Sequence, residues 1–420
     1  MSLVKTRNTC RVCGSTRLKP ILSLGEQYVS NFVDSASQEQ VKAPLELVLC
    51  RCCSLLQLKH TVSGEVLYRH YWYRSGVNAS MKKALAEIAE EAEQLAKLDP
   101  ADIVVDIGCN DGTLLRAYKT KQIHQVGFEP ALNLVPEAQV GTYVIIGDFF
   151  SHKAFYNVIG GIRVKIISAI AMFYDLDDPN RFVEDIKKTL HKNGVFIIQM
   201  NYMPLMLKNN AFDNICHEHL EYYSLQSLEY LLKKHGLEVF DVKLNEVNGG
   251  SFRVYVKHKG CSLYSVSERV QWLRLGEEKQ HLDTIKPYKD FERRVQNLKV
   301  TTMQFIKKQV NLGKKVFVYG ASTKGNTLLQ FYGLDTSLIV AAAERSPDKY
   351  GKKTVGTLIP IVSEEEARAV KPDYFLVLPW HFLSEFVKRE HEFLEHDGKF
   401  IVPLPNFKII GKEEVKKCVS

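Results

Sequence analysis

The chain has 420 residues and a formal net charge of +8, and 45% of its residues are hydrophobic and 25% are charged. This length exceeds what one hydrophobic core usually holds, so we expect two or three domains. No apolar run approaches the roughly 20 residues that span a bilayer, and the N-terminus MSLVKTRNTC lacks the apolar stretch of a signal peptide, which predicts a cytoplasmic protein without a membrane partner. The modest charge suits small anionic ligands such as nucleoside diphosphates as well as nucleic acid.

The first segment, residues 1–66, contains a pattern of cysteines that is typical of a metal site. Five of the nine cysteines fall between positions 10 and 53. They include two C-x-x-C knuckles, Cys10 with Cys13 and Cys50 with Cys53. Two such knuckles complete a closed tetrahedral site without an open position for chemistry, so we predict a structural zinc ion. Cys52 is an alternative fourth ligand, but Cys53 keeps the knuckle spacing.

The second segment, residues 67–260, alternates helix and strand patterns. An amphipathic helix is predicted over 79–98, followed by a β-branched strand over 103–107 and a glycine turn. Further strands are expected at 125–129, 143–146, 164–169, 195–201, 237–242 and 251–257, with helices at 181–191 and 225–234 between them. This alternation predicts an α/β domain with a mostly parallel sheet covered on both faces.

The glycine loop after this first strand reads GCNDGT and differs from a dinucleotide-binding loop. Asn110 stands where G-x-G-x-x-G requires its second glycine, between Gly108 and Gly112. Asp106 at the end of the strand would repel a pyrophosphate but suits the ammonium and sulfonium charges of S-adenosylmethionine. Glu129, at the end of the next strand, is placed to accept both ribose hydroxyls. A bare turn into a helix, with Glu129 at the surface, is the alternative.

The motif GDFF after the third strand adds two further candidates for the same ligand. Asp148 is expected near the adenine amino group and Phe149 near the face of the adenine ring. Together with the loop, these residues predict a binding site for S-adenosylmethionine.

The third segment, residues 261–420, begins with charged helical sequence over 265–310 and continues as a second, smaller Rossmann-like pattern. Its strand and glycine loop, KKVFVYGASTKGN, lacks G-K-[ST] and is therefore not a Walker A motif. Backbone amides at the following helix N-terminus, with Ser322 and Lys324, are predicted to cradle a pyrophosphate.

The stretch CHEHLEYYS at 216–224 places two histidines on either side of a carboxylate. An extended backbone would put His217 and His219 on one face, so a second metal is one interpretation. The spacing is not H-E-x-x-H and no third ligand is evident. A catalytic base with its helpers and a purely structural cluster are the other two interpretations.

In their order, these motifs resemble the zinc-containing, S-adenosylmethionine-dependent C-methyltransferases of deoxysugar biosynthesis, such as those that make tetronitrose and mycarose. The resemblance covers essentially the whole chain. It rests on the paired knuckles and on YWYRSG, VVDIGCNDGTLL, CHEHLEYYSL, NGGSFRVYV, YGASTKGNTLLQ and SPDKYGKKTVGTLIPI.

The resemblance implies a zinc module, a central Rossmann-like class I methyltransferase sheet and a smaller C-terminal Rossmann-like domain that helps to hold an NDP-sugar. It implies methyl transfer to C3 of a 4-keto sugar nucleotide linked to TDP or GDP. By resemblance His219 removes the C3 proton, Glu218 assists and Tyr73 lies near the reacting sugar. Further candidates near the substrate are Tyr71, Arg253 and Lys352. Tyr71 and Tyr73 are alternatively half-buried aromatic residues that hydrogen-bond through their hydroxyls.

Three positions depart from the family pattern. Cys216 precedes H-E-H where relatives carry a tyrosine, Tyr174 stands where some carry a histidine, and His381 replaces a commoner asparagine. We place all three near the substrate, where they either change the accepted sugar or redistribute roles.

Two other functions compete with this one. An O- or N-methyltransferase acting on a similar substrate would need no C–H acidity. A zinc-ribbon module that binds without catalysis would use its basic balance, but no contiguous run of basic and aromatic residues indicates a nucleic-acid partner. We expect a monomer or a dimer.

Overall fold

The N-terminal region forms a small β-rich module. The computed structural model describes residues 3–38 and 40–414. The strands of the module are β1 (Val4–Thr6), β2 (Leu18–Tyr28), β3 (Phe32–Val33), β4 (Lys42–Cys50), β5 (Leu56–Leu58) and β6 (His60–Val62), with the short helix α1 (Gly64–Tyr68) at its end. Strands β2, β4 and β5 pair antiparallel, and so do β1 and β6.

Two strands from elsewhere in the chain complete the sheets of this module. β12 (Glu221–Tyr222) pairs with β5, and β17 (Lys353–Thr354) pairs with β3. The module therefore hydrogen-bonds to the segment after the histidine pair and to the C-terminal region, and it holds both in place.

A seven-stranded sheet forms the centre of the molecule, in the order β13-β14-β11-β10-β7-β8-β9. All neighbouring strands are parallel except β14, which runs antiparallel to both of its neighbours. The strands are β7 (Ile103–Ile107), β8 (His124–Phe128), β9 (Val144–Ile146), β10 (Val164–Ile170), β11 (Leu190–Asn201), β13 (Leu237–Asn245) and β14 (Ser251–His258). The predicted parallel-rich α/β sheet is confirmed.

Helices cover both faces of this sheet because its strands are buried on both sides. α2 (Ala79–Ala96) packs an apolar stripe that includes Leu85, Ile88 and Ala92 against one face. The other face is covered by α4 (His152–Ile159), α5 (Pro179–Thr189) and α7 (Leu225–Lys234). Two short helices, α3 (Val135–Ala138) and α6 (Met203–Lys208), lie in the connections.

The C-terminal region contains a smaller sheet in the order β18-β16-β15-β19-β20-β21, parallel except for the β20–β21 pair. Its strands are β15 (Val316–Tyr319), β16 (Ala342–Glu344), β18 (Ile361–Ser363), β19 (Tyr374–Val377), β20 (Lys399–Val402) and β21 (Lys408–Ile410). Its helices are α10 (Thr323–Tyr332), α11 (Glu364–Ala369), α12 (Leu383–Arg389) and α13 (His391–Glu395). This is the second Rossmann-like unit that the sequence predicts.

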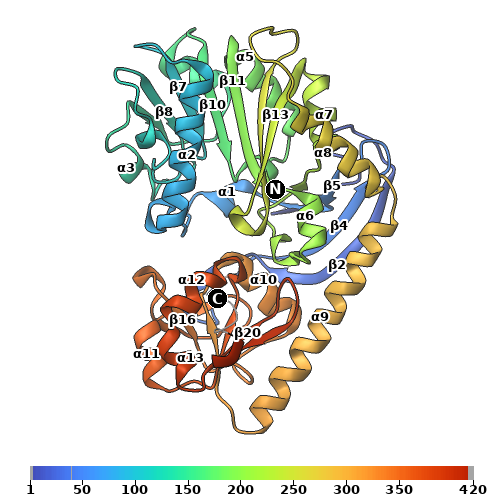
Figure 1. Cartoon of the computed structure of the whole chain (residues 1–420), viewed down its shortest axis with the longest axis vertical. Coiled ribbons are helices and arrows are strands. Elements are labelled where there is room, and N and C mark those ends of the chain that lie inside the picture. Colours follow the sequence, from blue (N-terminus) through green and yellow to red (C-terminus); the bar gives the residue numbers. More distant parts are fainter. Residues whose placement is uncertain (1–2, 39, 415–420) are drawn as a thin grey trace.

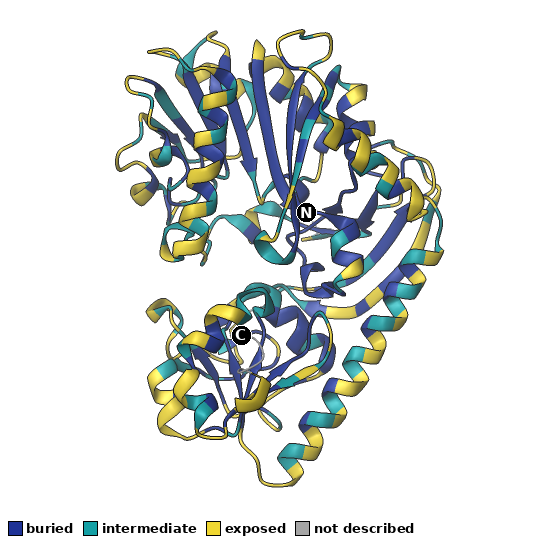
Figure 2. Ribbon diagram, in the orientation of Figure 1, coloured by how far each residue is buried: buried dark blue, intermediate teal, exposed yellow. Residues whose placement is uncertain are grey.

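Two helices connect the sheets. α8 (Glu268–Lys279) packs beside α7, and the long helix α9 (Lys286–Asn311) runs down one side of the molecule to the C-terminal unit (Figure 1). Buried and exposed positions alternate along α9 (Figure 2). Its residues Tyr288, Phe291 and Val295 recur at helical spacing and join a hydrophobic cluster that contains strands of the N-terminal sheet and of the C-terminal unit. Among residues 3–38 and 40–414, no helix is long and apolar enough to cross a membrane.

Candidate active site

The four knuckle cysteines converge at the N-terminal module. The Sγ atoms of Cys10 and Cys53 lie 3.5 Å apart, as do those of Cys13 and Cys50, and all four lie within 4.8 Å of one another. Tetrahedral zinc with bonds of about 2.3 Å requires sulfur atoms about 3.8 Å apart, so this thiol set fits the ion. Cys52 is exposed and contacts the Ser15 hydroxyl instead. The zinc would tie the two knuckles together and leave no coordination position for a substrate.

The zinc module contacts the segment that follows the two histidines. The side chain of Arg11, next to Cys10, is buried and donates to the Leu58 carbonyl and the Thr61 hydroxyl. Its Nε lies 3.9 Å from a carboxylate oxygen of Glu221, which follows the histidine pair closely in sequence. The four cysteines therefore lie outside the cleft, and the module that they hold together supports the structure around it.

A cleft of about 1180 Å³ opens between the central sheet and the C-terminal unit. One wall comes from the loops after β7, β8 and β9, together with the strap that we define as residues 71–78. The opposite wall comes from the loops after β15, β16 and β19. The H-E-H segment lies between them. Ligands of open α/β sheets bind at the carboxyl ends of the strands, where both walls lie.

Two acids are placed for a cationic ligand on the wall formed by the loops after β7, β8 and β9, which we call the donor wall. Asp106 is 3% exposed, and one of its oxygens accepts from the Ser168 hydroxyl at 2.7 Å. The two oxygens of Glu129 accept from the backbone N–H groups of Asn110 (2.7 Å) and Ala131 (2.8 Å). Burial raises the pKa of Asp106 and of Glu129 to about 7. A bound cation would favour the ionised form of both carboxyl groups.

Of the other residues predicted to bind the methyl donor, some line the cleft and one serves the packing of the fold. Gly108, at φ +69°, Asp148 and Phe149 line the cleft. Gly112 lies outside the lining, and a Cβ there would approach the Ala138 carbonyl to 2.9 Å, so it serves close packing.

Asn110 lines the cleft, but its side chain binds the strap. Its Oδ1 accepts from Ser75 N at 2.9 Å and its Nδ2 donates to Tyr73 O at 3.0 Å. Asn133 makes a similar pair of bonds to the backbone of Tyr71. The strap is therefore fastened across the donor wall by two asparagine side chains. This brings Tyr71 and Tyr73 to the cleft, where loss of water from around the Tyr73 hydroxyl raises its pKa to about 12.

The two histidines of H-E-H point to different partners because residues 216–219 form a turn. His217 Nε2 bonds to the Ala43 carbonyl of the N-terminal sheet at 2.9 Å. His219 Nδ1 donates to the Asn214 carbonyl at 2.7 Å, and its ring packs on Tyr174 with centroids 4.3 Å apart. Among the described residues only the four cysteines form a potential metal cluster. The second-metal interpretation therefore has no geometric support.

The space around His219 is polar and crowded with unsatisfied groups. Glu218 is 6% exposed, and its Oε2 lacks a hydrogen-bond partner. Cys216 is buried at the cleft wall. Burial raises the pKa of the Glu218 carboxyl group and of the Cys216 thiol. His381 also reaches the cleft, and its Nδ1 lacks a partner. Buried polar atoms without partners in a cleft are the expected binding points for a polar substrate.

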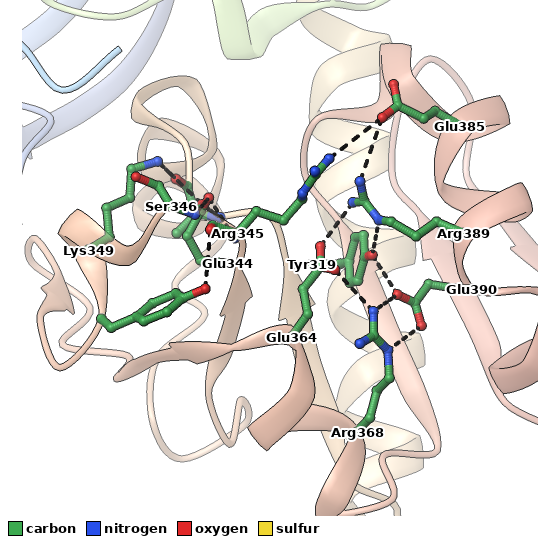
Figure 3. Close-up of polar contacts among 12 residues, drawn as sticks. Tyr319, Glu344, Arg345, Ser346, Lys349, Glu364, Arg368, Glu385, Arg389 and Glu390 are labelled. Atoms are coloured by element: carbon green, nitrogen blue, oxygen red, sulfur yellow. Dashed lines mark hydrogen bonds and ion pairs between the residues drawn. The ribbon is translucent and has the colours of Figure 1, made fainter. Parts of the chain in front are cut away.

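The C-terminal wall is held by a charged network (Figure 3). Arg389 donates to the Tyr319 hydroxyl at 2.9 Å and pairs with Glu364 at 3.0 Å, and its guanidinium lies 3.6 Å from Glu385. Arg345 lies 3.9 Å from Glu385 and remains largely exposed at the cleft wall. This arrangement leaves a guanidinium available to an anionic ligand.

The substrate residues predicted for the C-terminal region meet the cleft only in part. Ser322 lines it and caps α10 by accepting from Gly325 N at 3.0 Å, and Lys324 lines it as well. Lys352 lies outside the lining and pairs with Asp34 at 2.8 Å. Arg253 sits on β14, where it pairs with Glu91 at 2.8 Å, and it is also outside the lining. The structure does not bring these two cations to the cleft.

Sequence reasoning missed three residues that line the cleft, Asp175, Asp213 and Arg345, and the buried Asn214 behind His219. Asp175, Asp213 and Asn214 flank the motifs that were recognised, in AMFYDLDDP and FDNICHEH. Arg345 follows the acid that ends β16. Proximity to a recognised motif was the only available signal, because none of these residues forms a pattern of its own.

Three family models match the chain in order. The model described as "Putative zinc binding domain" matches residues 10–68, "Methyltransferase domain" matches 73–242, and "C-methyltransferase C-terminal domain" matches 246–405.

Individual proteins match over very different lengths. C-methyltransferase NovU of Streptomyces niveus is 31% identical over 416 residues, which are 98% of this chain and 99% of NovU. A tRNA U34 carboxymethyltransferase of Campylobacter jejuni is 24% identical over 108 residues, covering 24% of this chain and 35% of that protein. A solved S-adenosylmethionine-dependent methyltransferase from Clostridium acetobutylicum covers 43% of this chain and 92% of its own, at 15% identity and a TM-score of 0.34.

The likeness to NovU spans both chains from end to end, and the three models account for the zinc module, the central sheet and the C-terminal unit in turn. The chain therefore belongs to the family of S-adenosylmethionine-dependent C-methyltransferases that carry a zinc-binding N-terminal domain.

Proposed function

We propose that this protein methylates C3 of a 4-keto NDP-deoxysugar in branched-sugar biosynthesis, with His219 as the base. A carbon atom next to a carbonyl becomes nucleophilic only when its proton is removed, so the enzyme needs a base there and a donor for the enolate oxygen. The observation that carries the proposal is the orientation of one imidazole ring. The Nδ1–H of His219 donates to the Asn214 carbonyl, so the basic lone pair is on Nε2, and His219 lines the cleft.

His219 is neutral at physiological pH, so its Nε2 carries a free lone pair when the substrate binds. Burial lowers its pKa to about 3, and the charge of Lys324 acts in the same direction. The hydrogen bond to Asn214 opposes this shift in part. When the C3 proton leaves, Nε2 takes it and the Asn214 carbonyl holds the ring in position.

Two further groups that line the cleft contact the sugar in this proposal. The Glu218 carboxyl has an oxygen without a partner and assists by holding a sugar hydroxyl. Tyr73 keeps its phenol proton because its pKa is raised, so it donates a hydrogen bond to the enolate oxygen. Cys216, Tyr174 and His381 border the same space and determine which sugar fits.

Asp106 and Glu129 hold the methyl donor in this proposal, with Gly108 leaving room for it and with Asp148 and Phe149 beside its adenine. S-adenosylmethionine, when bound, supplies a methyl group carried on a positively charged sulfur. Each oxygen of Glu129 has capacity for one more hydrogen bond, which matches the two hydroxyls of a ribose.

The nucleotide of the sugar, TDP or GDP, lies along the C-terminal wall in this proposal. The N-terminus of α10 with its cap Ser322 offers backbone amides, and Arg345 offers a guanidinium. The predicted domain limits, 1–66, 67–260 and 261–420, assign zinc, methyl donor and nucleotide to separate domains.

Incubation with S-adenosylmethionine and a small panel of 4-keto NDP-sugars tests the proposal. We expect the mass of one added methylene unit in one product, and loss of the C3 hydrogen signal when the reaction runs in deuterium oxide. His219→Ala should abolish both, since a general base typically contributes roughly 10²–10⁴-fold.

Methylation at oxygen or nitrogen without C3 exchange would replace this proposal with an O- or N-methyltransferase. Equal mass gain by the wild type and by His219→Ala would show that His219 is not the base. Asp177→Asn is the matched control, because Asp177 lies outside the cleft lining and pairs with Arg7.

A further inference from the structure

Lys324 reaches toward the base, although its place in the sequence predicts a contact with phosphate. It lies in the first turn of α10, and its Nζ donates to the Asn214 side-chain oxygen at 2.6 Å. No carboxylate of the described residues lies within ion-pair distance of its ammonium group. Two of its three N–H donors therefore remain available at the cleft wall.

Asn214 holds this cation and the base at the same time. Its backbone carbonyl accepts from His219 Nδ1, while its side-chain oxygen accepts from Lys324 Nζ and from the Asn201 amide. Asn214 is 4% exposed, so this arrangement is buried. An imidazole and an ammonium group anchored on one residue have a fixed separation. A proton on carbon and the oxygen of the adjacent carbonyl also have a fixed separation in the substrate.

The charges around Lys324 agree with a position close to the proposed base. Burial lowers its pKa, while the acidic groups of Asp213, Cys216 and Asp175 oppose the shift. The Lys324 charge in turn lowers the pKa of His219 and of His381. The ammonium therefore lies within electrostatic reach of the proposed base, at the sugar end of the cleft.

The outer part of the same wall offers other cationic partners for a diphosphate. Arg345 is largely exposed, with its nearest acid, Glu385, 3.9 Å away. The amides at the start of α10 lie on the same wall. A diphosphate therefore has cationic and N–H partners on this wall besides Lys324.

We propose that Lys324 donates a hydrogen bond from Nζ to the carbonyl oxygen of the acceptor sugar while His219 takes the proton from the adjacent carbon. This inference rests on the proposed function. The C–H bond breaks, its proton moves to Nε2, and its electron pair forms the enolate, whose charge develops on the oxygen that Lys324 contacts. Lys324 keeps its own proton and acts as a second donor beside Tyr73. A preorganised donor of this kind is typically worth roughly 10²–10³-fold in rate.

The experiment separates the enolate role from a phosphate role. Exchange of the C3 hydrogen with deuterium oxide is measured for the wild type, Lys324→Met and Lys324→Arg, with S-adenosylhomocysteine in place of the donor. Binding of TDP and GDP without sugar is measured by calorimetry on the same proteins. Lys349→Met is the matched control, because Lys349 lines the same wall but its Nζ is held by Glu344 at 3.3 Å and by the Ala321 carbonyl.

For Lys324→Met we expect exchange to fall by roughly 10²–10³-fold while nucleotide affinity stays within about threefold of wild type. Lys324→Arg should recover part of the rate, and Lys349→Met should exchange at a rate within about threefold of wild type. Nucleotide affinity that falls in Lys324→Met while exchange persists would overturn the inference and return Lys324 to the diphosphate.

A second readout reports the position of Lys324 independently of the rate. Removing its charge should raise the pKa of His219, observed by NMR titration of the ring, whereas Lys349→Met should leave it unchanged. An unchanged His219 pKa in Lys324→Met would contradict the inference. If the wild type neither exchanges nor methylates any sugar of the panel, the proposed function fails and the inference falls with it. Exchange in the wild type that Lys324→Met retains in full overturns the inference alone.

Discussion

Glu129 and Glu344 occupy the same place in two similar units, each at the end of the strand that follows a glycine loop. Glu129 accepts two backbone N–H groups. Glu344 accepts three, from Ala321, Arg345 and Ser346, and also binds the Lys349 ammonium. A carboxylate has about four acceptor sites, so Glu129 keeps two for a ligand and Glu344 keeps none.

The difference shows how one topology supports two kinds of binding. In the central unit the acid lines the cleft and keeps free acceptor capacity, and the loop leads into a short 3-10 turn rather than a regular helix. In the C-terminal unit the acid binds backbone N–H groups of the neighbouring loops. The glycine loop leads into α10, whose N-terminus supplies positive potential. The first unit therefore suits a cationic nucleoside and the second an anionic group.

Exchanging each acid for alanine should show the largest difference between the two units. Glu129→Ala should weaken S-adenosylmethionine binding about 100-fold, because two charge-assisted hydrogen bonds are lost. Glu344→Ala should leave that affinity within about twofold and instead lower the melting temperature, because three backbone donors lose their acceptor. Calorimetric titration and thermal unfolding measure both, and equal loss of donor affinity in the two variants would contradict the comparison.

The first glycines of the two loops should differ in the free energy of unfolding. Gly320 has φ +87°, and a Cβ there would lie 2.7 Å from the Pro379 ring, which cannot move easily. Gly108 has φ +69°, and its Cβ would meet only the flexible Met172 side chain at 3.2 Å. We expect Gly320→Ala to cost about 2–3 kcal/mol and Gly108→Ala about 1–2 kcal/mol in denaturant unfolding. A larger cost for Gly108→Ala would show that the two loops are not packed in this way.

Donor binding should depend on pH in a way set by the central unit. The pKa of Asp106 and of Glu129 is raised to about 7 by burial, so both are increasingly protonated below that pH. A cationic donor favours the ionised forms, and its affinity should therefore fall as pH drops below 7, by up to about tenfold per pH unit for each carboxyl that must ionise. Glu129→Gln should bind more weakly and show a flatter dependence. An affinity that is constant between pH 5 and 8 would mean that neither carboxyl group has to ionise for the donor to bind.

Arg74 joins the two walls and should give the smallest effect. It pairs with Glu137 of the central region at 3.3 Å and with Asp348 of the C-terminal unit at 2.8 Å. Its side chain is 32% exposed, and partly exposed pairs contribute about 0–1 kcal/mol. Arg74→Gln should raise the KM for the sugar nucleotide less than about fivefold, and the difference should shrink at high salt. Asp348→Asn is the paired control, and the two changes should not be additive.

Local patterns in the sequence predicted most of the fold. Strand β7 and helix α7 have the predicted bounds, because a β-branched run and a capped amphipathic stretch are local signals. The first turn of α5 begins at Pro179, two residues before the prediction, since Asp178 caps it. The strand partners β12 and β17 were not foreseen, because two-residue strands carry no period.

The predicted site residues come together where a motif carried the chemistry and lie apart where only residue type did. The four cysteines come together, and the glycine loop, Glu129 and His219 share one cleft. The sequence placed Lys352 and Arg253 near the nucleotide, but each is engaged by an acid outside the cleft. Which acid a cation meets depends on long-range packing, which a single sequence does not display.

The sequence alone determined the zinc ligands, the two strand and glycine-loop units and the family, because these depend on short spacings along the chain. Only the tertiary structure decided which face each histidine of H-E-H presents and that Asn214 joins His219 to Lys324. The reason is physical: spacing fixes a knuckle or a loop within a few residues, whereas the direction of a hydrogen bond between residues 110 positions apart is fixed only when the two sheets pack around the cleft.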